Sequence, residues 1–269
     1  MDNRLIAPNR TKRALAEGRA VLGTMVAEIR QPAIMQLLVN GGFDFAIIDN
    51  EHGPFNIETI ADLSRTAVAL GITPIVRVPD IAYPYIAYPY IAQALDGGAQ
   101  GIMAPRIYTA AQAKQVVDTV KYPPFGQRGS AMNRGQTTFR AGNVIEMMDQ
   151  ANQESLVIIQ VETAAALESI DEIVSVPGVD VAFIGPNDLS IALGVPGQTT
   201  SSVLVDAIER VMDACARHGV TAAIQMNDMK LALHWAEQGF RMLSYSAETS
   251  LLTSAALTAT AALRAVYQK

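Results

Sequence analysis

The sequence predicts an α/β fold in which eight parallel strands, each followed by a helix, close into a (β/α)₈ TIM barrel. Half of the 269 residues are hydrophobic, which is enough for one sizeable core. Eight short apolar runs rich in β-branched residues recur at intervals of a few tens of residues, and segments with helical periodicity separate them. Strands that are apolar almost throughout are typical of a parallel sheet buried on both faces.

The predicted strands follow one another along the whole chain. They are VLGTMVA from Val21, DFAIID from Asp44, TPIVRV from Thr73, AQGIMAP from Ala99, LVIIQVE from Leu156, VDVAFIG from Val179, VTAAIQ from Val220 and FRMLSYS from Phe240. Helical periodicity marks the intervening IETIADLSRTAVAL, AAQAKQVVDTV, AAALESIDEIVSV and SSVLVDAIERVMDACARHG. Gly71 and Gly219 follow two of these runs, as glycines that end helices do.

The chain is expected to form a single domain over residues 1–269, because no Pro-, Gly- or Ser-rich linker divides it. The longest irregular piece runs from Tyr122 to Asn143, and a loop of that length in a compact domain usually has a function.

Composition excludes several functions. The net charge is −6 with acids and bases interspersed, so no basic stripe is offered to nucleic acid. Cys215 is the single cysteine and forms no internal disulfide, and the polar N-terminal residues do not resemble a secretory signal. The apolar segment from Ser250 is too short and too polar to span a bilayer. A cytoplasmic protein without membrane or nucleic-acid partners is expected.

The last predicted helix, from about Ser250, has more apolar surface than one face of a barrel needs. Two interpretations fit this excess. The helix lies on its own barrel, or it packs across a subunit boundary.

Reactive residues gather at the carboxyl ends of the predicted strands, where barrels of this kind place their active sites. His52 follows the second strand, and Arg77 ends the third. Gln160 and Glu162 end the fifth strand, and the sixth ends in the run Gly185, Pro186, Asn187 and Asp188. These side chains are expected to share one rim.

The carboxylates of Glu162 and Asp188 form a sparse oxygen site on neighbouring strands. Such a site suits Mg²⁺ or Mn²⁺, which keep waters or substrate oxygens in their other positions. The structural interpretation is that each acid stabilises the N-terminus of the helix that follows it.

Arg77 lies in an apolar strand and needs a partner there. That partner is either a structural acid such as Asp49 or a substrate carboxylate or oxyanion. None of the five lysines lies in a predicted strand or at its carboxyl end, which disfavours a Schiff-base mechanism.

Several long motifs, in order, resemble the HpcH/HpaI family of metal-dependent, class II pyruvate aldolases, which includes 4-hydroxy-2-oxoheptanedioate and 2-keto-3-deoxy acid aldolases. They are FDFAIIDNEHGPFN, PIVRVP, ALDGGAQGIMAP, YPPFGQRG and IIQVETAAALESIDEIVSVPGVDVAFIGPNDLS. The resemblance implies a barrel whose last helix is exchanged between subunits of a homo-hexamer, a dimer of trimers. It also implies reversible cleavage of a 4-hydroxy-2-oxo acid to pyruvate or hydroxypyruvate and an aldehyde, through a metal-stabilised enolate.

The resemblance also assigns roles to residues. Glu162 and Asp188 match the metal ligands, for Mg²⁺ or Mn²⁺ with Co²⁺ as an alternative. His52 matches the catalytic histidine and Arg77 the arginine that stabilises the oxyanion, while Asp96 matches an acid that pairs with the histidine across a subunit interface. Gln160 matches a polar neighbour of the keto acid, and the backbone amides from Gly185 through Pro186 and Asn187 to Asp188 match a cradle for its carboxylate.

Two other functions fit the same scaffold. The site could decarboxylate oxaloacetate, as an enzyme resembling macrophomate synthase would. A binding or structural protein without catalysis is disfavoured, because every matched position holds a competent side chain. Asn50 departs from the family, which often has glycine there, and this puts the aldehyde preference in question.

The segment IAYPYIAYPY repeats five residues, first as 81–85 and again as 86–90. Arg77 and Asp96 are therefore 19 positions apart, and removing one copy would leave 14, as expected for the family. Proline in a helix interior costs about 3 kcal/mol, so the helix is expected to begin at Pro89 and leave the first copy in the loop.

The duplication has two interpretations. A five-residue insertion in a surface loop is tolerated at little cost and needs no function. Alternatively, Tyr83, Tyr85 and Tyr88 line the entrance for the aldehyde or contact a neighbouring subunit.

Overall fold

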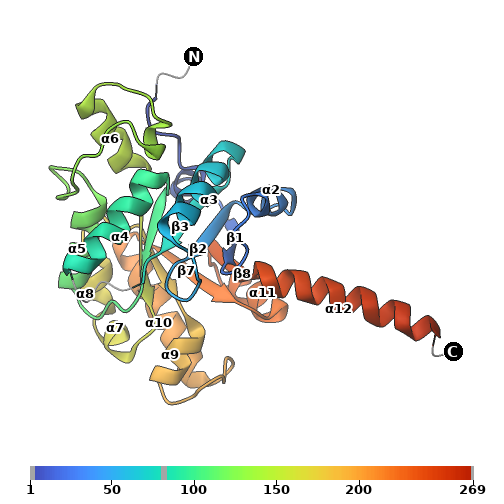
Figure 1. Cartoon of the computed structure of the whole chain (residues 1–269). Coiled ribbons are helices and arrows are strands. Elements are labelled where there is room, and N and C mark those ends of the chain that lie inside the picture. The colour runs from blue at the N-terminus through green and yellow to red at the C-terminus, as the bar shows by residue number, and fades with distance from the viewer. Residues whose placement is uncertain (1–3, 80–83, 268–269) are drawn as a thin grey trace.

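The strands form a closed barrel in sequence order, as predicted (Figure 1). The computed structural model describes residues 4–79 and 84–267, with side chains in the second range from residue 88 onward. All neighbouring strands are parallel, and β8 pairs with β1 to close the ring. The strands are β1 (Val21–Val26), β2 (Phe45–Asp49), β3 (Thr73–Arg77), β4 (Gly101–Ala104), β5 (Leu156–Val161), β6 (Val181–Ile184), β7 (Thr221–Met226) and β8 (Met242–Ala247).

Helices surround the barrel, and several of them are capped at their N-terminus by a polar side chain. Asn56, Thr109 and Ser201 each accept a hydrogen bond from a backbone N–H in the first turn of the helix they precede. The helices are α1 (Arg10–Ala16), α2 (Ala33–Asn40), α3 (Ile57–Leu70), α4 (Pro84–Gly97), α5 (Ala110–Val120), η1 (Gly135–Thr137), α6 (Val144–Glu154), α7 (Ala164–Glu168), α8 (Ile170–Val174), α9 (Pro186–Ala192), α10 (Ser202–His218), α11 (Met229–Glu237) and α12 (Glu248–Tyr267).

Two predicted helix ends are confirmed at glycines. Gly71 ends α3 with a φ of 82°, and Gly219 ends α10 with a φ of 69°. This left-handed conformation favours glycine, because any other side chain would crowd its own backbone.

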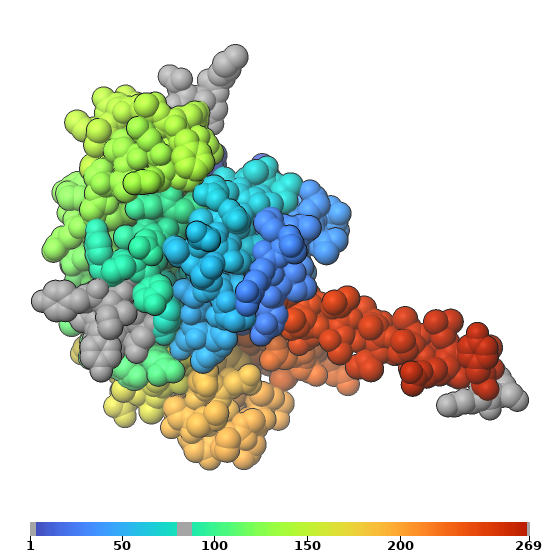
Figure 2. Space-filling model, viewed as in Figure 1, coloured from blue at the N-terminus to red at the C-terminus, as the bar shows by residue number. Residues whose placement is uncertain are grey.

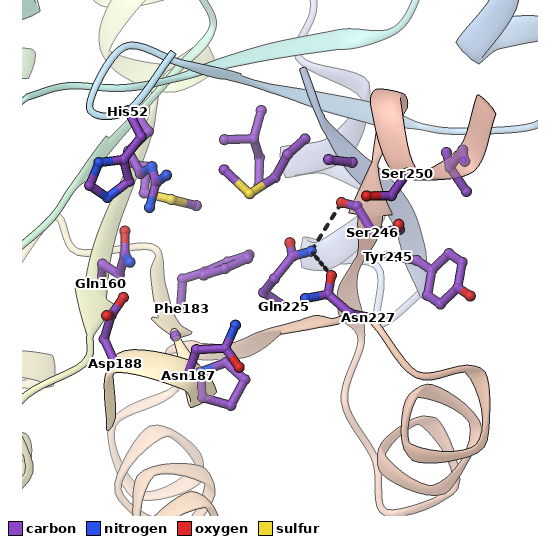
Figure 3. A pocket seen from close by; sticks show the side chains of 18 of the residues that line it. His52, Gln160, Phe183, Asn187, Asp188, Gln225, Asn227, Tyr245, Ser246 and Ser250 are labelled. Carbon is purple, nitrogen blue, oxygen red and sulfur yellow. Dashed lines mark hydrogen bonds between the residues drawn. The ribbon is translucent and has the colours of Figure 1, made fainter. Parts of the chain in front are cut away.

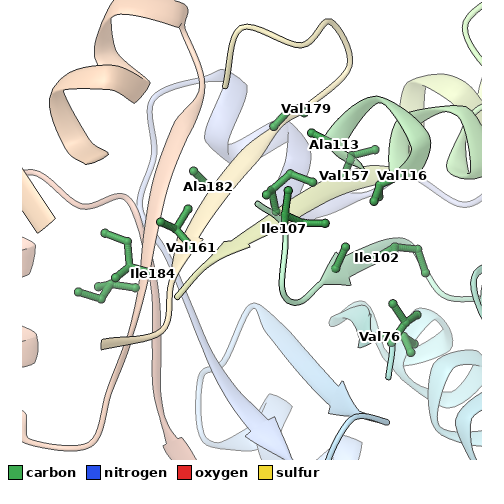
Figure 4. Close-up of a cluster of buried hydrophobic side chains, with 14 of the residues drawn as sticks. Val76, Ile102, Ile107, Ala113, Val116, Val157, Val161, Val179, Ala182 and Ile184 are labelled. Atoms are coloured by element: carbon green, nitrogen blue, oxygen red, sulfur yellow. The ribbon is translucent and has the colours of Figure 1, made fainter. Parts of the chain in front are cut away.

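The barrel strands bury side chains on both faces. Ile47 and Ile75 point into the barrel, whereas Ile48 and Val76 belong to the layer between barrel and helices. Figure 4 shows this outer layer, in which Val157 of β5 lies near Ala113 and Val116 of helix α5. Successive side chains of a strand point to opposite faces, so burial of both faces explains the nearly continuous apolar runs.

The last helix, α12, leaves the barrel and projects away from it (Figures 1 and 2). Only Glu248, at its first position, is buried. Leu252, Leu257 and Leu263 are each more than 60% exposed. The interpretation that this helix lies on its own barrel is therefore wrong. None of the helices in the described part of the chain is long and apolar enough to cross a membrane.

Helix α4 begins at Pro84, so the expectation that it begins at Pro89 is wrong. Pro84 occupies the first helical position, where its missing N–H has no intrahelical acceptor to lose. Pro89 then lies inside the helix and removes one backbone hydrogen bond. The turn gained upstream outweighs that single loss. Residues 81–83 of the first copy lie outside the described residues, as do the side chains of Tyr83 and Tyr85.

Pro89→Ala is expected to raise the free energy of unfolding, by up to about 3 kcal/mol, because it restores the missing hydrogen bond in an exposed helix interior. Pro84→Ala is the matched control and should change stability little, since Pro84 is the first residue of the helix. Urea unfolding of both variants measures the difference. Equal effects of the two substitutions would contradict this account of α4.

The long loop from residue 122 to 143 packs beside α4. Arg128 forms an ion pair with Asp96 at 2.6 Å, and the N–H of Gly129 donates to the Tyr88 hydroxyl at 2.8 Å. Tyr88 is thus held against this loop.

Candidate active site

A cavity of about 590 Å³ opens at the carboxyl end of the barrel (Figure 3). Its floor is apolar and is made by Met25, Ile47, Met103 and Phe183, whose side chains point from their strands into the barrel. Most of the predicted site residues line it: His52, Arg77, Gln160, Gly185, Pro186, Asn187 and Asp188. Neither Tyr88 nor any residue of the loop 122–143 does.

Arg77 is held rigidly by a carboxylate of the neighbouring strand. Its Nε donates to Asp49 Oδ1 at 2.9 Å, and its Nη2 donates to Asp49 Oδ2 at 2.7 Å. Burial acts to raise the pKa of Asp49, but the hydrogen bond and charge of Arg77 outweigh it, so the pKa lies below its usual value. The structural acid considered for Arg77 is therefore its partner, and the guanidinium still faces the cavity.

A second carboxylate, Glu51, lies beside the same guanidinium. Glu51 Oε2 is 3.3 Å from Arg77 Nη1, and Glu51 Oε1 is 3.4 Å from Arg106 Nε. Burial raises the pKa of Glu51, and the neighbouring arginines only partly offset that effect. Sequence reasoning missed Glu51 as a site residue, although it directly precedes His52.

Glu162 is 6% exposed and lies at the end of β5. Its Oε1 accepts the backbone N–H of Arg106 at 2.8 Å, and its Oε2 accepts from Gln160 Nε2. Burial raises its pKa, and the charges of Glu51 and Asp188 raise it further. Thr163, and not Glu162, caps the following helix. The helix-capping interpretation of Glu162 is therefore wrong.

Arg106 was also missed, and no pattern in the sequence marks it. Its φ of 56° is unusual for a side chain with Cβ, and this backbone conformation turns its N–H toward Glu162. Strained residues of this kind often occur at functional sites. Arg106 thus contacts Glu162 through its backbone and Glu51 through its side chain.

Asp188 lies in the first turn of α9, where an acid also favours the helix dipole. Gly185 leaves space beside the carboxylates: a Cβ there would lie 3.2 Å from Gln160 Nε2 and 3.5 Å from Glu162 Oε2. The backbone N–H of Gly185 already donates to the carbonyl of Val161, and Pro186 has no backbone N–H to donate. The predicted cradle of amides is thus reduced to the N–H groups of Asn187 and Asp188.

His52 sits in the turn after β2, with 65% of its side chain exposed. Its backbone N–H donates to Asp49 Oδ1 at 3.3 Å. Asn50 braces the same turn, because its Nδ2 donates to the carbonyl of Phe55 at 2.9 Å. The asparagine that departs from the family pattern therefore fixes the loop that carries the histidine.

Asp96 is the one predicted site residue besides Glu162 that does not line the cavity. It lies near the end of α4 and pairs with Arg128 of the same chain. The structure therefore does not bring Asp96 to His52 within the described part of one subunit.

The positions of the lysines disfavour a Schiff-base mechanism. Lys121 is buried, and burial together with nearby Lys12 lowers its pKa to about 7. Its Nζ donates to the carbonyls of Asn152 and Ser155, at 2.7 and 2.8 Å. Ser155 immediately precedes β5, so this lysine lies at the amino end of the barrel. No lysine of residues 4–79 or 84–267 lines the cavity.

Comparison with known proteins gives a consistent result. The model of the HpcH/HpaI aldolase/citrate lyase family matches residues 24–255. A hydroxypyruvate/pyruvate aldolase of Deinococcus radiodurans is 36% identical, over 95% of this chain and 90% of its own. A 4-hydroxy-4-methyl-2-oxoglutarate aldolase of Chaetomium globosum is 34% identical over 90% of both chains. The solved structure of an HpcH/HpaI aldolase from Desulfitobacterium hafniense has a TM-score of 0.88 at 31% identity, and the match covers 94% of this chain and 96% of that one.

The fold and the site together define a (β/α)₈-barrel lyase whose cavity is lined by an arginine clamped by Asp49 and by the carboxylate of Asp188. The chain belongs to the HpcH/HpaI aldolase/citrate lyase family. The predicted fold, family and aldolase class are confirmed.

Proposed function

We propose that the protein cleaves a 4-hydroxy-2-oxo acid reversibly to pyruvate or hydroxypyruvate and an aldehyde. The observation that carries the proposal is the position of Arg77, which Asp49 fixes at the wall of the cavity that also holds Asp188 and Gln160. A cation fixed in this way stabilises negative charge that develops on a substrate oxygen. The similarity to the hydroxypyruvate/pyruvate aldolase of Deinococcus radiodurans supports this choice of substrate.

The residues present fit a divalent metal ion, for which Mg²⁺ or Mn²⁺ is proposed and Co²⁺ is an alternative. Glu162 and Asp188 repel each other in a partly buried setting, and a dication would relieve that repulsion. Gln160 Oε1 is buried without a hydrogen-bond partner among the described residues, and Gly185 leaves room nearby. Within the described ranges, no three His, Cys, Asp or Glu residues form a complete metal site, so substrate oxygens would complete the shell. When bound, the ion supplies Lewis-acid stabilisation of charge on the keto acid.

The chain's own residues account for the remaining steps. The N–H groups of Asn187 and Asp188 bind the keto acid's carboxylate, and Arg77 stabilises charge on its keto oxygen. The exposed His52 side chain takes the proton of the C4 hydroxyl during cleavage and returns it in the aldol direction. Gln160 holds Glu162 in place through its hydrogen bond.

We also propose that the protein assembles as a homo-hexamer. The projecting α12 exposes leucines along its length and needs a covering partner. Exchange of this helix between subunits would bury that surface, and a neighbouring subunit would bring its Asp96 toward His52. Sedimentation equilibrium of the full chain tests the hexamer.

The activity test measures pyruvate release from 4-hydroxy-2-oxo acids with and without Mg²⁺, Mn²⁺ or Co²⁺. We expect release in the presence of a metal, loss after chelation, and recovery when the metal is restored. Oxaloacetate is assayed beside these acids, because the same cavity could bind it and lose CO₂. A kcat/KM higher for oxaloacetate than for every hydroxy-oxo acid would replace the aldolase proposal with decarboxylation.

A further inference from the structure

The cavity has a second polar side that the chemistry proposed above does not use. Gln225 and Asn227 come from β7 and its end, Tyr245 and Ser246 from β8, and Ser250 from the start of α12. In the ring of eight strands, β7 lies directly opposite β3, which carries Arg77. Figure 3 shows these side chains across Phe183 from His52, Gln160 and Asp188.

This second side has no charged group. Arg77 and Asp188 are the charged residues that line the described cavity, and both belong to the first side, as does His52. The polar groups of the second side are amides and hydroxyls, beside Ala247 and Leu251. The cavity therefore pairs a charged half with a neutral polar half over an apolar floor.

The neutral half is held in one arrangement. Gln225 Nε2 donates to the Ser246 carbonyl at 3.0 Å and to Asn227 Oδ1 at 3.4 Å (Figure 3). Ser246 has a φ of 61°, a left-handed conformation that is unusual for a residue with Cβ. With its oxygen accepting from Gln225, Asn227 keeps its Nδ2 as a hydrogen-bond donor. Strain at Ser246 together with this network is typical of a built binding surface.

We propose that the neutral half binds the aldehyde and selects an uncharged aldehyde that carries hydroxyl groups; this rests on the function proposed above. A keto acid held by Arg77 and the amides of α9 occupies the charged half, so the group beyond C4 extends toward β7 and β8. Amides and hydroxyls replace the water lost from a substrate hydroxyl. A second carboxylate would lose its hydration without meeting a cation, and an alkyl chain would leave polar groups unpaired.

Asn227 is assigned the contact with the aldehyde, and Gln225 is a positioning residue that acts through Asn227. The two roles predict different behaviour. Loss of Asn227 removes a donor to substrate, whereas loss of Gln225 leaves that donor present but free to turn.

The test compares aldol addition of pyruvate to glyceraldehyde, propanal and succinic semialdehyde by the full chain with Mg²⁺. We expect kcat/KM for glyceraldehyde to exceed both others by about tenfold or more. Asn227→Leu should lower the glyceraldehyde value by roughly 10–100-fold and change the propanal value little, and Gln225→Leu should have a smaller effect in the same direction. Asn40→Leu, at the exposed end of α2, is the control.

Exchange of the pyruvate methyl protons with deuterium oxide, in the absence of aldehyde, reports the charged half alone. Wild-type protein and both leucine variants should exchange equally. Normal exchange with a wild-type preference for the semialdehyde or propanal would overturn this inference and leave the proposed function intact. Loss of exchange in the leucine variants would show a structural role and also overturn it, whereas wild-type protein without exchange or cleavage would overturn the proposed function itself.

Discussion

Arg77→Ala is expected to lower kcat for pyruvate release by roughly 10²–10³-fold, because it removes a fixed donor to the developing oxyanion. Arg77→Lys is the matched comparison: it keeps the charge but loses the two-point contact with Asp49, and should recover only part of the rate. Turnover by Arg77→Ala close to that of wild-type protein would refute the assigned role.

The same substitution should also destabilise the fold. It leaves the buried Asp49 carboxylate without its partner, and breaking a buried ion pair in this way costs about 3–5 kcal/mol. Asp49→Asn breaks the same ion pair but retains Arg77, so comparing the two variants shows how much of the rate loss comes from losing the guanidinium itself. Urea unfolding gives the stability of each variant, and kcat is measured only where the variant remains folded.

The stability difference between wild-type and Arg77→Ala protein should depend on pH. The pKa of Asp49 in the folded protein is below its usual value, so the folded state favours the ionised form. Its contribution is therefore fully present above the ordinary titration range of aspartate and is lost as the pH falls through the folded pKa. Unfolding curves for both proteins from neutral to acidic pH should converge, and a constant difference would contradict the pairing.

Glu162→Gln is expected to weaken Mn²⁺ binding by at least about 100-fold and to abolish pyruvate release with it. Stability should change little, because the substitution removes a carboxylate whose ionised form burial disfavours. Calorimetric titration with Mn²⁺ provides a readout that does not depend on activity. Glu172→Gln, on the exposed surface of α8, is the control and should bind Mn²⁺ normally. Unchanged affinity in Glu162→Gln would remove Glu162 from the metal site.

The pattern of apolar and polar residues along the sequence determined the fold and the approximate position of the site. The eight apolar runs became β1 to β8, because a strand covered on both faces must be apolar throughout. His52, Arg77 and Asp188 all follow or end such runs, and parallel strands deliver their carboxyl ends to one rim. The sequence therefore placed these three residues around one cavity without any knowledge of their distances.

Tertiary structure decided which groups meet. Arg106 is far from Glu51 and Glu162 in sequence, and the folded chain brings its side chain to Glu51 and its backbone N–H to Glu162. The start of α4 depended on two opposed effects: the hydrogen bond lost at Pro89 and the extra helical turn that begins at Pro84. The cost of Pro89 alone did not predict which effect is larger. Helix α12 has an apolar sequence, yet the chain directs it away from the barrel. Periodicity depends on neighbours in sequence, whereas partners, helix ends and packing directions depend on distances that only the folded chain defines.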